Sequence, residues 1–159
     1  MKFSILTIGK IKEKWMRDGI EEYYKRLKPM VKVEVVESNE EKMPEDPSLA
    51  IKGKVLEKEG EKLLKSVQTS DCVVLLDIGG KEMSSEELAA WLRQKTTMGM
   101  NHFYFMIGGP YGNGENIRSR ADFKLSMGPM TFTHQMVRLI LFEQLYRAVK
   151  INRHEPYHL

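Results

Sequence analysis

A length of 159 residues, with 42% apolar and 30% charged residues, is typical of one soluble globular domain with a single core. No apolar run reaches the ~20 residues that a membrane-spanning helix needs, and the apolar start is too short for a signal peptide, so we expect a cytoplasmic protein. A net charge of +3 is too small to prove a nucleic-acid partner. Composition therefore excludes a membrane protein and leaves enzymes and binding proteins open.

The first part of the chain is predicted to alternate strands and helices. Short runs rich in β-forming residues predict strands over Phe3–Ile8 and Val31–Val36. Between them, apolar residues at helical spacing predict a helix over Glu13–Lys28. Cations crowd the start of this helix, and they either contact phosphates or only face solvent. They are Lys10, Lys12, Lys14 and Arg17.

An acidic loop, Glu37–Pro47, separates the second strand from the next helix. Asp46 is the predicted N-cap of that helix, because Asp is frequent at N-caps and a following proline suits the first helical turn. The helix is expected to run to about Ser66. Its apolar residues are sparse and two glycines weaken it, which predicts a partly exposed helix.

The middle of the chain contains two continuous apolar runs, Cys72–Asp77 and Phe103–Ile107, which are typical of central parallel strands. Between them, Ser84 and Glu87 have the spacing of a capping box. This spacing predicts a helix that continues to about Thr97.

The last third adds a strand over Phe123–Met127 and a long apolar helix from about Phe132 to Ile151, buried on more than one side. Strands that alternate with helices predict an α/β fold with a mainly parallel sheet, helices on both faces and right-handed crossovers. No linker divides the chain, so we expect one domain over residues 1–159.

Charge is unevenly distributed along the chain. Seven Lys or Arg and three acids lie between Arg118 and the C-terminus, whereas six acids and one Lys lie between Glu34 and Asp46. Arg138 interrupts the long apolar helix near its start, where it would bind a phosphate or carboxylate. Solvated helix faces explain the same distribution without a ligand.

Loops that contain glycine or proline follow three predicted strands, after Leu76, Ile107 and Met127. In open α/β sheets, ligands bind at the carboxyl ends of strands, so these loops predict a ligand site. The loop Gly108–Gly114 is not a nucleotide phosphate loop, since Glu115 stands where that motif requires Lys. It also lacks the third glycine of the dinucleotide fingerprint.

Other polar residues admit weaker interpretations. The sequence His154-Glu155-x-x-His158 matches a zinc motif by letter, but Pro156 prevents the helix that the motif needs, so we expect no metal. His134 belongs either to the ligand site or to the cap of the last helix. Cys72 is expected to be a buried apolar residue in a reducing compartment.

Four segments resemble one known family. They are Leu75–Lys81, Phe105–Gly112, Leu125–Arg138 and Pro156–His158. Their order and spacing are similar to those of the RlmH family, small methyltransferases of the SPOUT class that act on large-subunit ribosomal RNA. The resemblance implies a fold with a C-terminal trefoil knot, a homodimer, S-adenosylmethionine as cofactor, and N3 of a pseudouridine in the 23S rRNA of assembled ribosomes as the target.

The resemblance also implies site residues. The cofactor would be bound by Leu76, Gly108 and the run Met127, Gly128, Pro129, Met130, Thr131 and Phe132. Catalytic residues would be Arg153, Tyr157 and His158, supplied by the partner subunit. Apart from the resemblance, we expect Arg138 and Arg153 to bind RNA phosphate.

Two positions depart from the family pattern. Thr133 stands where the family usually has proline, and Leu159 replaces a terminal basic residue. Two alternatives remain open at this point: an RNA-binding or ribosome-associated factor without catalytic activity on the same fold, and an enzyme acting on a small nucleotide.

Overall fold

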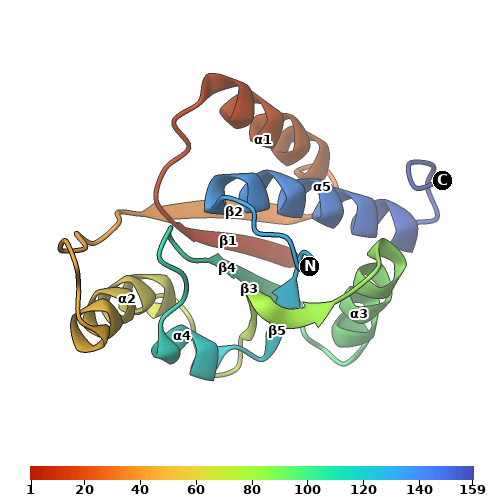
Figure 1. Cartoon of the computed structure of the whole chain (residues 1–159). Coiled ribbons are helices and arrows are strands. Elements are labelled where there is room, and N and C mark those ends of the chain that lie inside the picture. Colours follow the sequence, from red (N-terminus) through yellow and green to blue (C-terminus); the bar gives the residue numbers. More distant parts are fainter.

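The computed structural model describes all residues from Met1 to Leu159. Five parallel strands form one sheet in the order β2-β1-β4-β3-β5 (Figure 1). The strands are β1 (Lys2–Ile8), β2 (Lys32–Ser38), β3 (Cys72–Glu82), β4 (His102–Ile107) and β5 (Phe123–Ser126). Parallel pairing places the carboxyl ends of all five strands toward one edge of the sheet, which confirms the predicted sheet type.

Helices cover both faces of the sheet. On one face, α5 (His134–Asn152) packs between α1 (Lys14–Leu27) and α3 (Ser85–Thr97). On the other face, α2 (Leu49–Leu64) packs against the short α4 (Glu115–Arg120). None of these helices has the length and apolar composition to cross a membrane.

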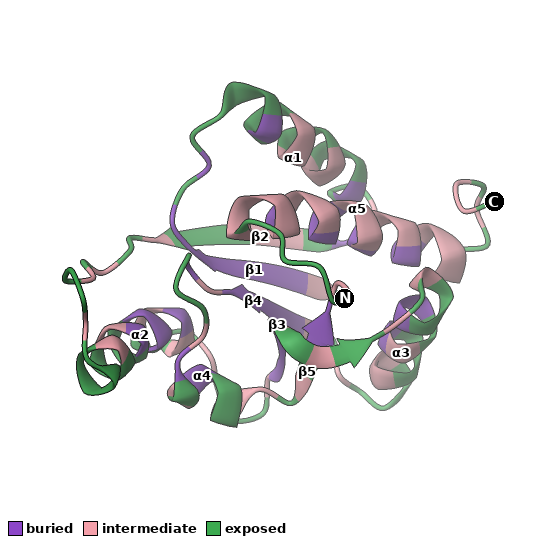
Figure 2. Ribbon diagram, in the orientation of Figure 1, coloured by how far each residue is buried: buried purple, intermediate pink, exposed green.

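The core lies mainly between the sheet and the layer of α1, α3 and α5, and Figure 2 shows the buried residues concentrated along β1 and β4. Phe3 meets the rings of Phe103 and Phe105 edge-on, at centroid distances of 6.2 and 5.6 Å. Phe142 of α5 is also fully buried in this cluster. Cys72 is buried as predicted, and burial raises the pKa of its thiol.

Several element boundaries differ from the sequence-based predictions. Ser48, not Asp46, caps α2, because its side chain accepts a hydrogen bond from the Ile51 N–H at 3.2 Å. Thr133 caps α5 by accepting from Met136 N at 3.2 Å, so this helix begins at His134. The predicted capping box of α3 is confirmed.

Strand β3 extends five residues beyond Asp77, which the sequence did not predict. After a shift in register it pairs with β5 a second time, Lys81 with Leu125 and Glu82 with Ser126. Gly80 makes this possible, because a Cβ there would lie 2.7 Å from the backbone carbonyl of Lys124. Any side chain at this position would separate the two strands.

Truncation of a fully buried ring tests the core. Phe105→Ala should lower the free energy of unfolding by about 3–5 kcal/mol, since it removes apolar contacts and leaves a cavity. Urea denaturation measures the change. Met98→Ala is the control, because Met98 is exposed and should alter stability by less than ~0.5 kcal/mol. Equal midpoints for both variants would contradict the description of the core.

Candidate functional site

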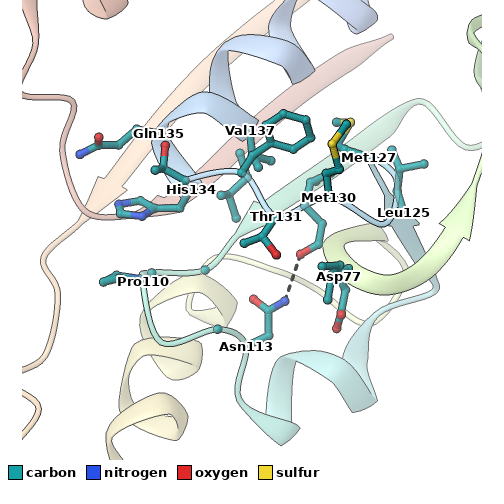
Figure 3. A pocket seen from close by; sticks show the side chains of 18 of the residues that line it. Asp77, Pro110, Asn113, Leu125, Met127, Met130, Thr131, His134, Gln135 and Val137 are labelled. Carbon is teal, nitrogen blue, oxygen red and sulfur yellow. Dashed lines mark hydrogen bonds between the residues drawn. The ribbon is translucent and has the colours of Figure 1, made fainter.

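A cavity of about 580 Å³ lies at the carboxyl edge of the sheet. Its walls come from the ends of β3, β4 and β5, the loops that follow them, and the first turn of α5 (Figure 3). The volume is in the range of small-molecule and cofactor sites. The three loops predicted to form a ligand site therefore do meet at one cavity.

The loop after β4 approaches the cavity through backbone rather than side chains. A Cβ at Gly108 would collide with Asn113 Oδ1 and lie 2.8 Å from the Gly112 carbonyl oxygen. Asn113 Nδ2 donates to the Leu76 carbonyl at 3.0 Å, which ties this loop to the end of β3 (Figure 3). Asn113 Oδ1 is buried without a hydrogen-bond partner, so the wall holds an unused acceptor.

The loop after β5 is held by one hydroxyl. Ser126 Oγ accepts from the Gly128 N–H at 3.1 Å and donates to the Gly128 carbonyl at 3.2 Å. Gly128 has φ of 111°, a conformation that favours glycine. Beyond it, Met130 and Phe132 line the cavity yet remain exposed to solvent. The rim therefore offers apolar surface that a bound ligand would cover.

Sequence reasoning missed a charged pair on the wall. Asp77 Oδ2 lies 3.2 Å from Arg118 Nε, and Asp77 Oδ1 accepts from the Gly79 N–H at 3.0 Å. Both charged side chains line the cavity. The signal for Asp77 was its position directly after the apolar run of β3, at the strand end where ligands bind.

His134 lines the cavity at the start of α5, where the capping role belongs to Thr133. Burial lowers the pKa of its imidazole, the Glu40 carboxylate opposes the shift, and Arg138 adds to it. His134 Nε2 lies 4.0 Å from Glu40 Oε1 and makes no hydrogen bond. The ring is therefore neutral at pH 7, and it belongs to the cavity wall.

Of the eight residues expected to bind the cofactor, seven line this cavity. They are Leu76, Gly108, Met127, Gly128, Met130, Thr131 and Phe132. The eighth, Pro129, belongs to the same loop but not to the cavity wall.

The position of Arg138 argues against the expected RNA contact. Its side chain is nearly fully buried, with the residue 3% exposed. Its guanidinium donates to Glu37 Oε2 at 2.6 Å, to Thr7 Oγ1 at 2.7 Å and to the Gly9 carbonyl at 3.0 Å. An RNA phosphate cannot reach this guanidinium, because it is buried and both of its terminal nitrogens are already bonded within the protein. Arg138 instead fastens the start of α5 to the ends of β1 and β2.

The three residues expected to be catalytic lie at the opposite end of α5. The Tyr157 hydroxyl donates to Glu143 Oε1 at 2.9 Å, and His158 lies between Arg147 and Glu86, at 3.1 and 2.7 Å. A helix of 19 residues is ~28 Å long, and no tail residue lines the cavity of the same chain.

The surroundings of the tail limit its chemistry. Burial, together with hydrogen bonds to Tyr23 and Glu143, raises the pKa of the Tyr157 phenol. A phenol so held stays protonated near pH 7, where it can donate a hydrogen bond but cannot accept a proton. Arg153 is exposed, and its Nε donates to Glu155 at 2.7 Å.

Replacing Arg138 distinguishes a structural role of its buried guanidinium from a role in RNA binding. Arg138→Met should lower the free energy of unfolding by about 3 kcal/mol, because it leaves Thr7 and Gly9 without their buried donor. Urea denaturation measures the loss, with Arg93→Met on exposed α3 surface as control. An Arg138→Met protein of unchanged stability and reduced RNA affinity would contradict the structural role.

Comparison with known proteins identifies the family. Residues 1–158 match the family model described as "Predicted SPOUT methyltransferase". Over 158 residues the chain is 48% identical to the ribosomal RNA large subunit methyltransferase H of Carboxydothermus hydrogenoformans, covering 99% of each chain. The chain belongs to the RlmH family of SPOUT methyltransferases. The enzyme of the same name from Bifidobacterium animalis subsp. lactis is 46% identical, again over 99% of each chain.

The structural comparison agrees at the level of the fold. A probable methylase family protein from Haemophilus influenzae Rd KW20 superposes with a TM-score of 0.50 at 12% identity, covering 99% of this chain and 70% of that one. The predicted SPOUT fold class and the family resemblance are thus confirmed. The trefoil knot itself stays a prediction.

Proposed function

We propose that this protein methylates the 23S ribosomal RNA of the large subunit. The methyl donor would be S-adenosylmethionine, and the acceptor N3 of a pseudouridine in assembled ribosomes. The observation that carries the proposal is the cavity built by three strand-end loops in a chain that matches RlmH relatives over its whole length. A ribosome-associated factor without catalytic activity would have no use for such a cavity. A ribosomal substrate also implies a cytoplasmic protein.

The cavity suits the proposed cofactor. Its wall combines apolar side chains that can cover an adenine ring with backbone close to Gly108. Asn113 Oδ1, which is buried and unpaired, suits an N–H donor such as an exocyclic or α-amino group. The Asp77 carboxylate adds an acceptor on the same wall. When bound, S-adenosylmethionine would supply a methyl group activated by a sulfonium centre.

The remaining tasks for the protein are to hold the two reactants in line and to let the N3 proton leave. The cavity contributes orientation, and neutral His134 adds no positive charge beside a cationic cofactor. The tail would orient the acceptor base: Tyr157 as a hydrogen-bond donor, Arg153 on RNA, and His158 as the group that assists proton loss. Because the tail lies far from its own cavity, a second copy of the chain would provide these residues.

Replacing Gly108 with alanine tests the cofactor site, because it adds only a methyl side chain. Gly108→Ala should weaken S-adenosylmethionine binding at least tenfold, because the added Cβ collides with Asn113 and distorts the loop. Isothermal titration calorimetry on the free protein measures the affinity. The matched control is Gly53→Ala on α2, where a Cβ meets nothing within 4 Å. Equal affinities for the two variants would place the cofactor elsewhere.

Mixed dimers test which chain supplies the tail. A dimer of one Gly108→Ala chain and one His158→Ala chain, purified with two affinity tags, retains one cavity and one tail that are both intact, on different chains. If the tail acts on the partner, this dimer should transfer methyl groups to ribosomes at roughly half the wild-type rate, having one of two sites. At an S-adenosylmethionine concentration that leaves the Gly108→Ala cavity empty, each parent homodimer should be inactive. An inactive mixed dimer would contradict the shared site.

A further inference from the structure

The first turn of α1 exposes a tryptophan. Trp15 is 61% exposed, while its neighbour Met16 is buried against the domain. The other tryptophan, Trp91, packs near Phe103 and Phe123 at centroid distances of 5.8 and 5.1 Å. No aromatic ring or cation of the chain covers the Trp15 indole in this way. Trp15 therefore exposes most of its surface and belongs to neither hydrophobic cluster of the core.

Three lysines precede Trp15 in the sequence. Lys10 and Lys12 are exposed and form no ion pair, and Lys14 pairs only with Asp18, at 2.6 Å, on the surface. An exposed pair of this kind contributes little energy, so Lys14 remains available to a stronger anion. Glu13 is the other acid here, which leaves the segment basic. We call Lys10, Lys12, Lys14 and Trp15 the α1 tip.

The α1 tip is anchored rather than loose. Arg17 donates from one guanidinium nitrogen to the carbonyls of Ile11 and Lys12, at 3.5 and 3.2 Å. The Ile11 side chain between the two lysines is buried. These contacts hold the backbone of the link from β1 to α1, on which Lys10 and Lys12 are exposed. A backbone that is already fixed loses less entropy when a ligand binds.

The α1 tip begins at the rim of the cavity. Lys10 directly follows Gly9 at the end of β1, and its carbonyl accepts from Gln135 Nε2 at 3.5 Å. Gln135 lines the cavity, and a Cβ at Gly9 would lie 3.3 Å from His134 Nε2. From this point the chain leaves the sheet edge beside the start of α5 and leads to α1 (Figure 1). A polymer that reaches the cavity can therefore continue along the α1 tip.

We propose that the α1 tip binds single-stranded RNA beside the methylated nucleotide. Trp15 stacks on an unpaired flanking base, and Lys10, Lys12 and Lys14 contact backbone phosphates. An aromatic face combined with cations is the usual means of binding single-stranded RNA. A second copy of the chain fits this surface less well, because lysine is depleted in interface cores and a two-fold contact would bring like charges together. The inference rests on the proposed function and adds a substrate contact to it.

The test compares side chains at position 15 that differ in their ability to stack on a base. Trp15→Leu keeps apolar area but loses the aromatic face, whereas Trp15→Phe keeps it. Kinetics of methyl transfer to ribosomes measure the effect. Trp15→Leu should raise the KM for ribosomes about 5- to 150-fold, which is the loss of affinity expected for one stacked base. The kcat should change little. Trp15→Phe should restore most of the affinity. Calorimetry should give the same affinity for S-adenosylmethionine in all three proteins.

The lysines are tested by salt dependence. Lys12→Gln should reduce the slope of log affinity against log salt by about 0.7 to 0.9, which corresponds to one lost phosphate contact. Lys54→Gln is the control, since Lys54 is exposed on α2 at the opposite face of the sheet and forms no ion pair. Equal slopes for the two variants would overturn the phosphate contact.

Other outcomes separate this inference from the proposed function. If the wild type methylates no ribosomal RNA, binding of a labelled single-stranded oligoribonucleotide still tests the α1 tip, and loss of that binding in Trp15→Leu supports it. Unchanged RNA binding and KM in Trp15→Leu would overturn the inference while leaving the methyltransferase intact. A Trp15→Leu protein that changes from dimer to monomer in sedimentation would show a contact between copies instead, which also overturns it.

Discussion

The parallel pairing of β3, β4 and β5 is the constraint on which the site depends. Because these strands run in one direction, the chain leaves each of them at the same edge, and the three loops cannot avoid one another. Particular residues then allow these loops to approach one another closely. Gly108 lets one loop fold onto Asn113, and the Asn113 amide holds the end of β3. The cavity is thus a consequence of strand direction and of positions where a side chain will not fit.

The buried guanidinium of Arg138 connects this edge to the rest of the molecule. It joins α5, which begins at the cavity, to the ends of β1 and β2 through three hydrogen bonds, two of which are buried. The start of α5 therefore cannot move independently of the sheet. A rigid start of α5 fixes His134 and Gln135 on the cavity wall and, through Gln135, the carbonyl of Lys10. The proposed cofactor site and the proposed RNA surface therefore share one support.

Much of the fold could be predicted from sequence because apolar runs and helical spacing are local signals. The capping box at Ser84 and the strand at Phe103–Ile107 needed no tertiary information. The extension of β3 could not be predicted, because it depends on the fit of Gly80 against β5. Arg138 looked like a ligand-binding group for the same reason: a lone arginine in an apolar helix does not reveal that Glu37 and Thr7, over 100 residues away, are its partners.

The most direct test of the account is the chemical identity of the product. Ribosomes that lack the modification would be incubated with the protein and S-adenosylmethionine carrying a labelled methyl group, and the 23S rRNA would be digested and analysed by mass spectrometry. The account predicts one labelled nucleoside, a pseudouridine methylated at N3, formed by the wild type and not by Gly108→Ala. A label on another nucleoside would contradict the proposed acceptor, and no label in the RNA would contradict the proposed function.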